Sequence, residues 1–276
     1  MKLAVGALVA ELVGEKFPDD ADTGILERFS VAPDRPADFV VAVTWGDLPV
    51  AAWRTSTVRR FEMDPNGLIV RLEADELTAT FDIPRRHVDV HLAGAWPRAL
   101  VAPLTRASQM FGLTTGRALH LHSSSVERDG WAYVFMGHSE AGKSTAALLT
   151  REAGIGRILR EEMTAVGDLT GDDPLLAFTL PSTEKNRLPV EPAAVPLRAI
   201  YWLVQAEADS VHTIGLPQQV KHLCSAASIG IRHRTMTVAA IELAERLARR
   251  VPVKELHFRL APDFWWAIDS DLESGV

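Results

Sequence analysis

Apolar and polar residues alternate in several short segments of the first hundred residues. These segments are rich in β-branched residues, and alternation with a period of two predicts half-buried strands. They read FVVAVTW (39–45), LIVRLEA (68–74), LTATFDI (77–83) and HVDVHLA (87–93). The sequence DPNG (64–67), just before the second segment, has the residue types of a tight turn. We therefore expect a small, mostly antiparallel β module at the amino end.

The pattern changes at residue 97. PRALVAPLTRASQMFGL (97–113) reads as an amphipathic helix that leads into a second part of the chain. We place a domain boundary near residue 95, so that residues 1–95 form the β-rich module and residues 96–276 form a second domain. The expected fold class is α/β (α+β overall).

Two strand candidates of the second domain meet at a two-residue turn. ALHLHSSSVER (118–128) and WAYVFM (131–136) are joined by Asp129-Gly130, and Asp-Gly between two apolar runs is a strong hairpin signal. In a hairpin closed by residues 129 and 130, opposed positions have numbers that sum to 259. His122 would then face Gly137.

A glycine-rich loop follows the second of these strands. Residues 137–145 read GHSEAGKST and match the spacing G-x-x-x-x-G-K-[ST]. The glycines of such a loop adopt conformations closed to other residues, so that backbone N–H groups point at phosphate oxygens. The lysine reaches the β- and γ-phosphates, and the serine hydroxyl holds magnesium. The predicted nucleotide-binding residues are Gly137, His138, Ser139, Glu140, Ala141, Gly142, Lys143, Ser144 and Thr145.

The elements around the loop are the ones that this motif requires. A buried strand precedes it, and KSTAALLTREAG (143–154) has a helix-compatible pattern with Gly154 and Gly156 as a stop. RILREEMTAVGDL (157–169) then resumes a strand-like run. This order predicts a right-handed, parallel crossover. The helix N-terminus adds the positive end of its dipole to the phosphate site.

Glu161 and Glu162 interrupt the last of these runs. Carboxylates in an apolar strand region are costly without partners, and neighbours on a strand point to opposite faces. One glutamate could therefore approach magnesium while the other accepts a proton from an attacking hydroxyl. The alternative is a solvated pair at a strand end.

His122 also has two interpretations. At the edge of a phosphate site, an imidazole could position a nucleophile, touch the transferred phosphoryl group or transfer a proton. Alternatively, it is a hydrogen-bonded histidine packed on a sheet. His120 lies on the same strand face, two residues further from the turn, and is expected to have a structural part.

Composition narrows the classes of protein. The chain has 276 residues, a mass of 30.2 kDa and 47% hydrophobic residues, enough for one large core or two domains. A net charge of −7 disfavours a nucleic-acid binder. The single cysteine, Cys224, excludes an internal disulfide and a cysteine-based metal cluster.

The amino-terminal sequence does not predict membrane targeting. Glu11 and Glu15 interrupt its apolar run, which argues against a signal peptide. No run approaches the roughly 20 apolar residues of a membrane span. We expect a soluble, cytoplasmic protein that has no membrane partner and has access to ATP.

Together, these segments resemble the HPr kinase/phosphorylase family and its shorter HPr-kinase-like relatives. The likeness rests on LHSSSVERDGWAYVFMGHSEAGKST (121–145) and ILREEMTAV (158–166), with weaker support from VPLRAIYWLVQ (195–205) and residues 251–268. It covers the chain from about Pro97 to the end. The resemblance implies a phosphoenolpyruvate-carboxykinase-like P-loop fold.

The resemblance also implies roles for single residues. His122 matches the family histidine near the transferred phosphoryl group, and residues 137–145 match the nucleotide loop. Glu161 and Glu162 fall where the family usually has paired aspartates, one of them the catalytic base. Two features depart from the family pattern: a glutamate is one methylene longer than an aspartate, and Glu140 puts an anion inside the loop.

The leading hypothesis is an ATP-dependent, Mg²⁺-dependent kinase that phosphorylates a serine hydroxyl of a peptide or small protein. Its catalytic residues would be His122, Lys143, Glu161 and Glu162, with Ser144 and Glu161 at the metal. The peptide acceptor comes from the resemblance, and the β module is the candidate for selecting it by pairing an edge strand with the peptide. The alternatives are a kinase for free serine or a similar small molecule, and a nucleotide-sensing module with little catalysis.

Other conspicuous residues are expected to be structural. Trp265 and Trp266 fit a core or an oligomer contact, so a homo-oligomer stays open. The arginines of AAIELAERLARR (239–250) fit the outer face and last turn of a helix. LPSTEKNRLP (180–189) is a polar loop that could bring Lys185 or Arg187 towards a substrate or simply be solvated.

Overall fold

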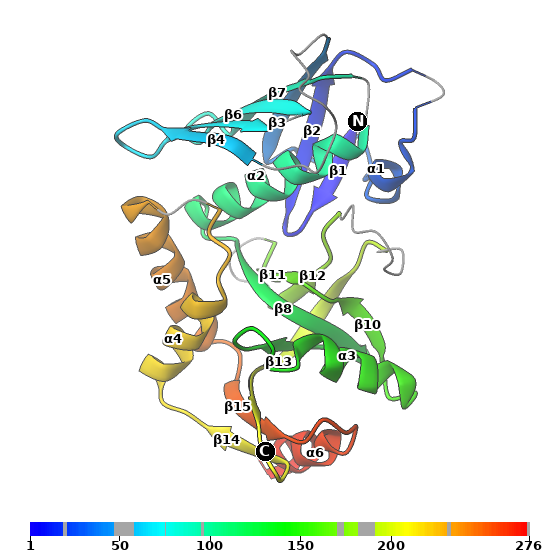
Figure 1. The fold of residues 1–276 in the computed structure, drawn as a ribbon, viewed down its shortest axis with the longest axis vertical. Helices are drawn as coiled ribbons and strands as arrows, with labels where there is room; N and C mark the ends of the chain where they lie inside the picture. Colours follow the sequence, from blue (N-terminus) through cyan, green and yellow to red (C-terminus); the bar gives the residue numbers. More distant parts are fainter. Residues whose placement is uncertain are drawn as a thin grey trace. The chain divides into compact units, whose positions relative to one another are not determined.

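The chain has a mixed α/β fold, drawn in Figure 1. The computed structural model describes residues 1–18, 21–46, 58–74, 76–94, 97–169, 174–181, 191–230 and 233–274. In those ranges the chain forms two mixed sheets and six α-helices. The expected α/β class is confirmed at this level. No helix in the described ranges has the length and apolarity needed to cross a lipid bilayer.

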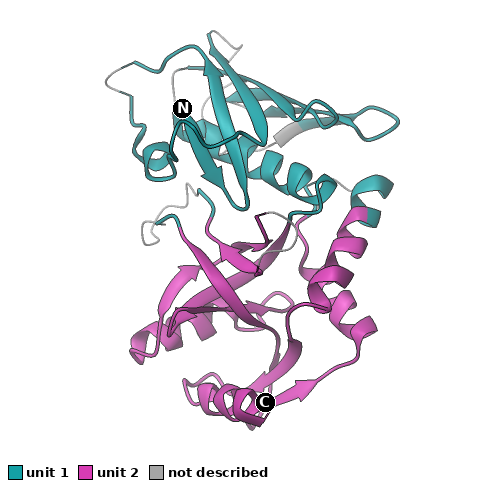
Figure 2. Ribbon diagram, turned by 180° about the vertical axis from the view of Figure 1, so that it is seen from behind, with its two compact units in different colours: residues 1–117, 180–192, 229–238 teal, residues 118–179, 193–228, 239–276 magenta. Residues whose placement is uncertain are grey.

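The chain divides into two compact units, coloured separately in Figure 2. Unit 1 contains residues 1–117, 180–192 and 229–238, and unit 2 contains residues 118–179, 193–228 and 239–276. The sequence predicted a single boundary near residue 95, whereas the first segment of unit 1 extends to residue 117 and two later segments also belong to unit 1. The helix that begins after residue 97 belongs to unit 1, and the chain returns to unit 1 twice.

Unit 1 is built on a seven-stranded sheet in the order β1-β2-β3-β7-β6-β5-β4. The four strands predicted in this region are all present. Two of the sheet's pairings, β2 with β3 and β3 with β7, are parallel, and the others are antiparallel. The strands are β1 (Lys2–Val5), β2 (Leu8–Gly14), β3 (Phe39–Trp45), β4 (Val58–Met63), β5 (Ile69–Ala74), β6 (Leu77–Asp82) and β7 (His87–Leu92).

The predicted DPNG turn connects β4 to β5. The Gly67 N–H donates to the Asp64 carbonyl oxygen at 2.9 Å. The Asp64 carboxylate accepts from the Leu68 and Ile69 N–H groups at 2.6 and 2.7 Å. Gly67 has a φ of 68°, which glycine adopts without steric cost.

The helices of unit 1 cover one face of its sheet. They are α1 (Gly24–Arg28), the 3₁₀ turn η1 (Pro97–Leu100) and α2 (Val101–Thr114). Phe111 of α2 packs on Phe39 of β3 with ring centroids 5.1 Å apart. The buried Ser108 hydroxyl donates to the Val5 carbonyl oxygen at 2.7 Å. The predicted helix at 97–113 is thus present, and its apolar face packs on the β module.

Unit 2 is built on an eight-stranded sheet. Its strands are β8 (Ala118–Arg128), β9 (Trp131–Met136), β10 (Arg157–Arg160), β11 (Met163–Gly167), β12 (Leu176–Phe178), β13 (Ala194–Gln205), β14 (Ser210–Thr213) and β15 (Val253–Phe258). On one edge of β8 lie β10 and β11, and on the other lies β9. From β9 the sheet continues through β13 and β15 to β14.

Apolar residues on one face of this sheet form a core with α3 (Lys143–Glu152) and α6 (Phe264–Ser274). Trp265 packs edge-on against Tyr133, with ring centroids 5.0 Å apart. Its indole N–H donates to the Thr150 hydroxyl at 2.9 Å. Trp265 is therefore a core residue, as expected, whereas Trp266 is exposed. The remaining helices are α4 (Leu216–Ala226) and α5 (Arg234–Ala248).

The predicted crossover runs from β9 through α3 to β10, and it differs in one respect from the expectation. Both β9 and β10 pair antiparallel with β8, on its two sides. The two strands therefore point the same way but are separated by β8. Because β9 pairs with one edge of β8 in the hairpin, β10 pairs with the other edge of β8.

Candidate functional site

The β8–β9 hairpin has the predicted register. Arg128 lies opposite Trp131 and Ser123 lies opposite Met136, so opposed residues sum to 259 over the whole ladder. The ladder ends at Met136, which makes His122 and Gly137 the next residues on the two strands. His122 is exposed, whereas its neighbours along β8 are buried. An exposed imidazole therefore lies where the glycine loop begins.

The glycine loop needs its glycines. A Cβ at Gly137 would lie 2.7 Å from the Ala141 Cβ, and a Cβ at Gly142 would lie 2.9 Å from Cζ of Phe258. Gly142 has a φ of 98° and caps the N-terminus of α3. Glu140 has a φ of 63° and an exposed side chain. The loop therefore keeps a tight backbone curve while the Glu140 carboxylate points to solvent.

Lys143 folds back over the loop. Its Nζ donates to the carbonyl oxygens of Gly137 at 3.1 Å and His138 at 2.9 Å. The residue is only 8% exposed, and burial lowers the pKa of its ammonium group from the usual value. The lysine nitrogen is thus held against the main chain at the start of the loop.

The first turn of α3 is fixed to the strand that carries His122. The buried Ser124 hydroxyl donates to the Lys143 carbonyl oxygen at 2.5 Å. Alternate residues of a strand share a face, so His122 lies on the face of β8 that meets the start of α3. Ser144 is exposed in that first turn, and Thr145 is half-buried. A hydroxyl, an ammonium group and an imidazole therefore come from neighbouring positions.

The expectation for Glu161 and Glu162 is wrong in its local structure. They occupy a bend between β10 and β11, not successive positions of one strand. The pairing with β8 is irregular between Ile158 and Arg160, and the chain leaves the strand conformation just after that irregularity. The rule that strand neighbours point to opposite faces therefore does not assign their directions.

The bend nevertheless places the main chain of Glu162 beside that of His122 and Ser123. Met163, the next residue, pairs with His122 across the sheet. The Ser123 N–H donates to the Glu162 carbonyl oxygen at 3.1 Å. Glu162 is exposed and Glu161 is half-buried. The main chain that carries the two glutamates therefore runs next to the strand position of the exposed imidazole.

His120 has the structural part expected of it. It is 1% exposed, and burial lowers its pKa to about 3. The imidazole is therefore neutral at any pH near 7. Its carbonyl oxygen accepts from the Ser228 N–H at 2.7 Å, which ties β8 to the segment after α4.

A ring stack next to the loop was not predicted from the sequence. The His138 imidazole meets Trp202 edge-on at 4.9 Å, and Trp202 stacks on His222 of α4 at 4.2 Å. His222 Nε2 donates to Glu255 at 2.8 Å. This hydrogen bond is the main cause that lowers the pKa of the Glu255 carboxyl group. The four residues come from four separate segments, so no local spacing could have revealed them.

Several sequence-based candidates lie away from this site or outside the described ranges. Lys185 and Arg187 lie outside the described residues. Cys224 is half-buried in α4, and burial raises the pKa of its thiol. Arg246 is exposed on α5, as expected, whereas Arg249 and Arg250 follow the end of that helix. Arg250 Nη1 donates to the Asp168 carboxylate at 2.5 Å. Among the described residues, no group of three or more His, Cys, Asp or Glu side chains could hold a metal ion by itself.

Comparison with family models found no match to this chain, and comparison with curated proteins found no significant match. The functional assignment therefore rests on the chemistry of the residues described above.

Proposed function

We propose that the protein is an ATP-dependent kinase that transfers the γ-phosphoryl group to a serine hydroxyl of a peptide or small protein. The observation that carries this proposal is that a glycine loop, its lysine, an exposed imidazole and the bend that carries two glutamates meet at one end of the β8–β9 hairpin. Phosphoryl transfer asks a protein mainly for positioning and charge stabilisation. These residue types supply both.

The loop would bind the triphosphate. Backbone N–H groups of residues 137–142 and the N-terminus of α3 attract anions. The Lys143 ammonium, now bonded to two loop carbonyl oxygens, would exchange one of these partners for a phosphate oxygen. Charge-assisted bonds of this kind are about twice as strong as neutral ones. Lys143 would therefore hold the β- and γ-phosphates.

The transfer step needs a base for the acceptor hydroxyl. The serine oxygen forms a bond to the γ-phosphorus, while the bond from that phosphorus to the β–γ bridging oxygen breaks and ADP leaves. The hydroxyl proton goes to the carboxylate of Glu161 or Glu162. His122 would align the transferred group or stabilise its charge. Glu161 and Glu162 lie in a bend, so strand geometry does not fix the directions of their side chains. A glutamate, with one methylene more than an aspartate, could therefore still direct its carboxylate towards the acceptor hydroxyl.

Magnesium fits this donor set. Mg²⁺ prefers oxygen ligands and in nucleotide sites takes most of them from phosphates and water, with one or two from the protein. Ser144 in the first turn of α3 and Glu161 in the bend are the oxygen donors that would hold it. When bound, the ion would neutralise charge on the phosphates. A site of this kind needs no cluster of protein ligands.

The edge of the sheet in unit 1 offers a surface for an extended acceptor. β4 is the last strand of that sheet, and its Phe61 and Met63 side chains are exposed. An edge strand has unpaired backbone groups that can bind a peptide as an added strand. This feature favours a peptide acceptor over free serine.

The test is incubation with γ-labelled ATP, Mg²⁺ and a serine peptide library, with free serine in a parallel reaction. We expect labelled phosphoserine peptides and loss of label in Lys143→Ala. Lys221→Ala removes an exposed lysine of α4 and should label peptides like the wild type. Equal labelling by Lys143→Ala would refute the mechanism. Label on free serine alone would favour the small-molecule kinase, and nucleotide-induced stabilisation without any product would favour the sensor.

A further inference from the structure

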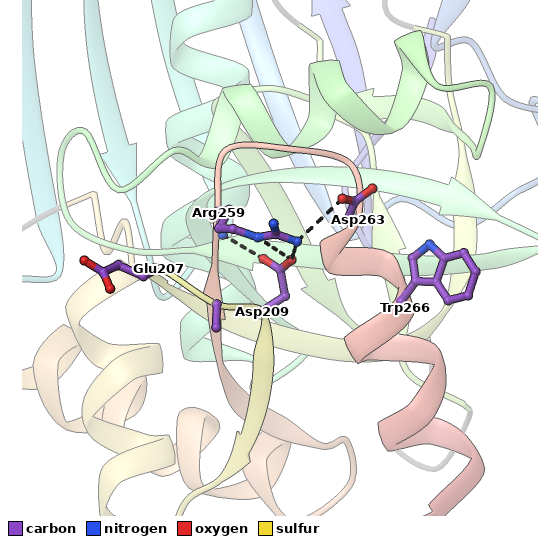
Figure 3. A pocket seen from close by; sticks show the side chains of 6 residues that line it. Glu207, Asp209, Arg259, Asp263 and Trp266 are labelled. Atoms are coloured by element: carbon purple, nitrogen blue, oxygen red, sulfur yellow. Dashed lines mark hydrogen bonds and ion pairs between the residues drawn. The ribbon is translucent and has the colours of Figure 1, made fainter.

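An open hollow of about 510 Å³ lies in unit 2. Figure 3 shows the side chains that line it. They come from the segment after β13, from the segment that joins β15 to α6, and from the first turn of α6. The lining residues are Glu207, Ala208, Asp209, Arg259, Asp263 and Trp266.

The position of the hollow follows from the strand directions. β9, β13 and β15 are parallel neighbours, so their carboxyl ends lie along one edge of the sheet. The glycine loop follows β9, residues 207–209 follow β13, and residues 259–263 follow β15. Ligands of sheets with parallel strands bind at such an edge. The hollow and the loop therefore lie on the same edge of the sheet.

Two contacts join the loop to the last residues of β13 and β15, the strands that lead into the hollow. Gln205, two residues before Glu207, donates from its side-chain nitrogen to the Glu140 carbonyl oxygen at 2.8 Å. Gly142 lies so close to Phe258 that a Cβ there would approach the Phe258 ring to 2.9 Å. The loop thus touches the ends of the two strands from which the lining segments extend.

The hollow and the residues of the transfer step lie on opposite sides of the loop. β9 runs between β8 and β13. His122 lies on β8, and Glu162 is bonded to β8 through Ser123. Residues 207–209 and 259–263 extend from β13 and β15. A triphosphate with its γ-phosphate near His122 would therefore run across the loop with its α-phosphate towards the hollow.

The chemistry of the hollow suits an uncharged, ring-containing group. The Trp266 indole is 80% exposed at the start of α6. The Arg259 guanidinium group donates to the Asp209 carboxylate at 3.0 and 2.6 Å, as the dashed lines in Figure 3 mark. These bonds fix the positions of both side chains in the lining of the hollow. Three carboxylates against one guanidinium leave a negative balance. This net negative charge repels a further phosphate group. The carboxylate oxygens can accept hydrogen bonds from hydroxyl and amino groups.

We propose that this hollow holds the nucleoside part of the nucleotide, with the base stacked on Trp266 and the sugar hydroxyls donating to the acidic rim. The inference deepens the proposed kinase function and rests on it. An exposed indole offers a π-face to any base, and such stacking strengthens binding by about tenfold or more. The loop selects the triphosphate, and the hollow selects a nucleoside attached to it.

The test compares binding of ATP with binding of inorganic tripolyphosphate, both with Mg²⁺, by calorimetry. Trp266→Leu should weaken ATP binding about tenfold and leave tripolyphosphate binding unchanged. Trp266→Phe keeps a ring and should recover most of the ATP affinity. Trp131→Leu is the matched control, because Trp131 is also exposed but starts β9 at the end remote from the loop. Its ATP binding should equal that of the wild type.

The outcomes separate the two proposals. If Trp266→Leu binds ATP like the wild type, or loses tripolyphosphate affinity to the same degree, the nucleoside site is refuted while the loop's role stands. If the wild-type protein binds neither compound, the kinase proposal fails and the nucleoside site fails with it. Thermal melting of each variant checks that it is folded, and the exposure of both tryptophans leads us to expect unchanged melting temperatures.

Discussion

The Ser124 hydroxyl donates a 2.5 Å hydrogen bond to the main-chain carbonyl oxygen of Lys143. This bond joins the strand that carries His122 to the first residue of the helix that follows the glycine loop. Both partners are buried, so the bond is shielded from competing water. The spacing between imidazole and loop is therefore set by a direct link, not by the loop alone.

Replacement of Ser124 tests this link. We expect Ser124→Ala to lower the free energy of unfolding of unit 2 by about 1 kcal/mol, the usual net contribution of a hydrogen bond. Ser225→Ala is the matched control, because the Ser225 hydroxyl donates to Lys221 in an exposed turn of α4 and should cost little. Thermal melting of both variants measures the difference. Equal melting temperatures would show that the bond does not stabilise the site.

Neutral replacements of the glutamates identify the base. Glu161→Gln or Glu162→Gln should lower the rate of phosphoryl transfer about a hundredfold or more, because a general base contributes that much. ATP affinity should change little for the residue that serves only as the base. Glu152→Gln, which alters an exposed carboxylate at the end of α3, should retain full activity. Single-turnover assays with each variant distinguish these results, and full activity in both bend variants would exclude a carboxylate base.

Aspartate replacements test whether the site is adapted to its two glutamates or weakened by them. If the glutamates work from their bend, Glu161→Asp combined with Glu162→Asp retracts both carboxylates by one methylene. A displacement of about 1 Å can cost on the order of a hundredfold in rate. We therefore expect the double variant to be slower than the wild type in the same assay. A faster double variant would mean that the glutamates weaken a site suited to aspartates.

Burial of His120 predicts a pH dependence of stability. Its pKa is lowered to about 3 in the folded chain from an ordinary value of 6.5. The unfolded chain therefore binds one more proton between these values, and stability falls as pH drops below about 6.5. The expected loss is about 1.4 kcal/mol for each pH unit. His120→Leu should show a flatter profile in denaturant titrations between pH 7 and pH 5, and identical profiles would contradict this cause.

The exposed edge of β4 predicts where a peptide binds. Phe61→Ser combined with Met63→Ser removes the two exposed apolar side chains of that strand. Peptide phosphorylation should then show a raised KM, by about tenfold, while ATP binding stays unchanged. Val238→Ser with Ile241→Ser, which removes exposed apolar residues of α5, serves as the control. An unchanged peptide KM would place the acceptor elsewhere.

Turn sequences predicted the strand pairs that are joined by tight turns. Asp129-Gly130 fixes the hairpin register, and the DPNG turn fixes β4 against β5, because each turn bonds within a few residues. The hairpin of β1 and β2 was missed, because its apolar run resembles a targeting segment and its turn is marked only by Gly6 (φ 67°). Burial of that run against α2 and β3 is a tertiary effect.

The candidate site was likewise predictable only where local signals determine it. The loop and the position of His122 follow from spacing and register. The bend at Glu161 does not, because it depends on how the long strand β8 pairs with two successive partners, β10 and β11. The stack of Trp202 on His222 joins segments about twenty residues apart across different elements, and sequence periodicity carries no signal for such contacts.

A crystal structure with a non-hydrolysable ATP analogue and Mg²⁺ is the most direct measurement of the site. We expect the terminal phosphate to lie within hydrogen-bonding distance of Lys143 Nζ. His122 and a carboxylate of Glu161 or Glu162 should reach that phosphate directly or through one water molecule. A triphosphate bound away from residues 137–145, or one whose terminal phosphate is further than one water from both His122 and the two glutamates, would contradict the kinase assignment.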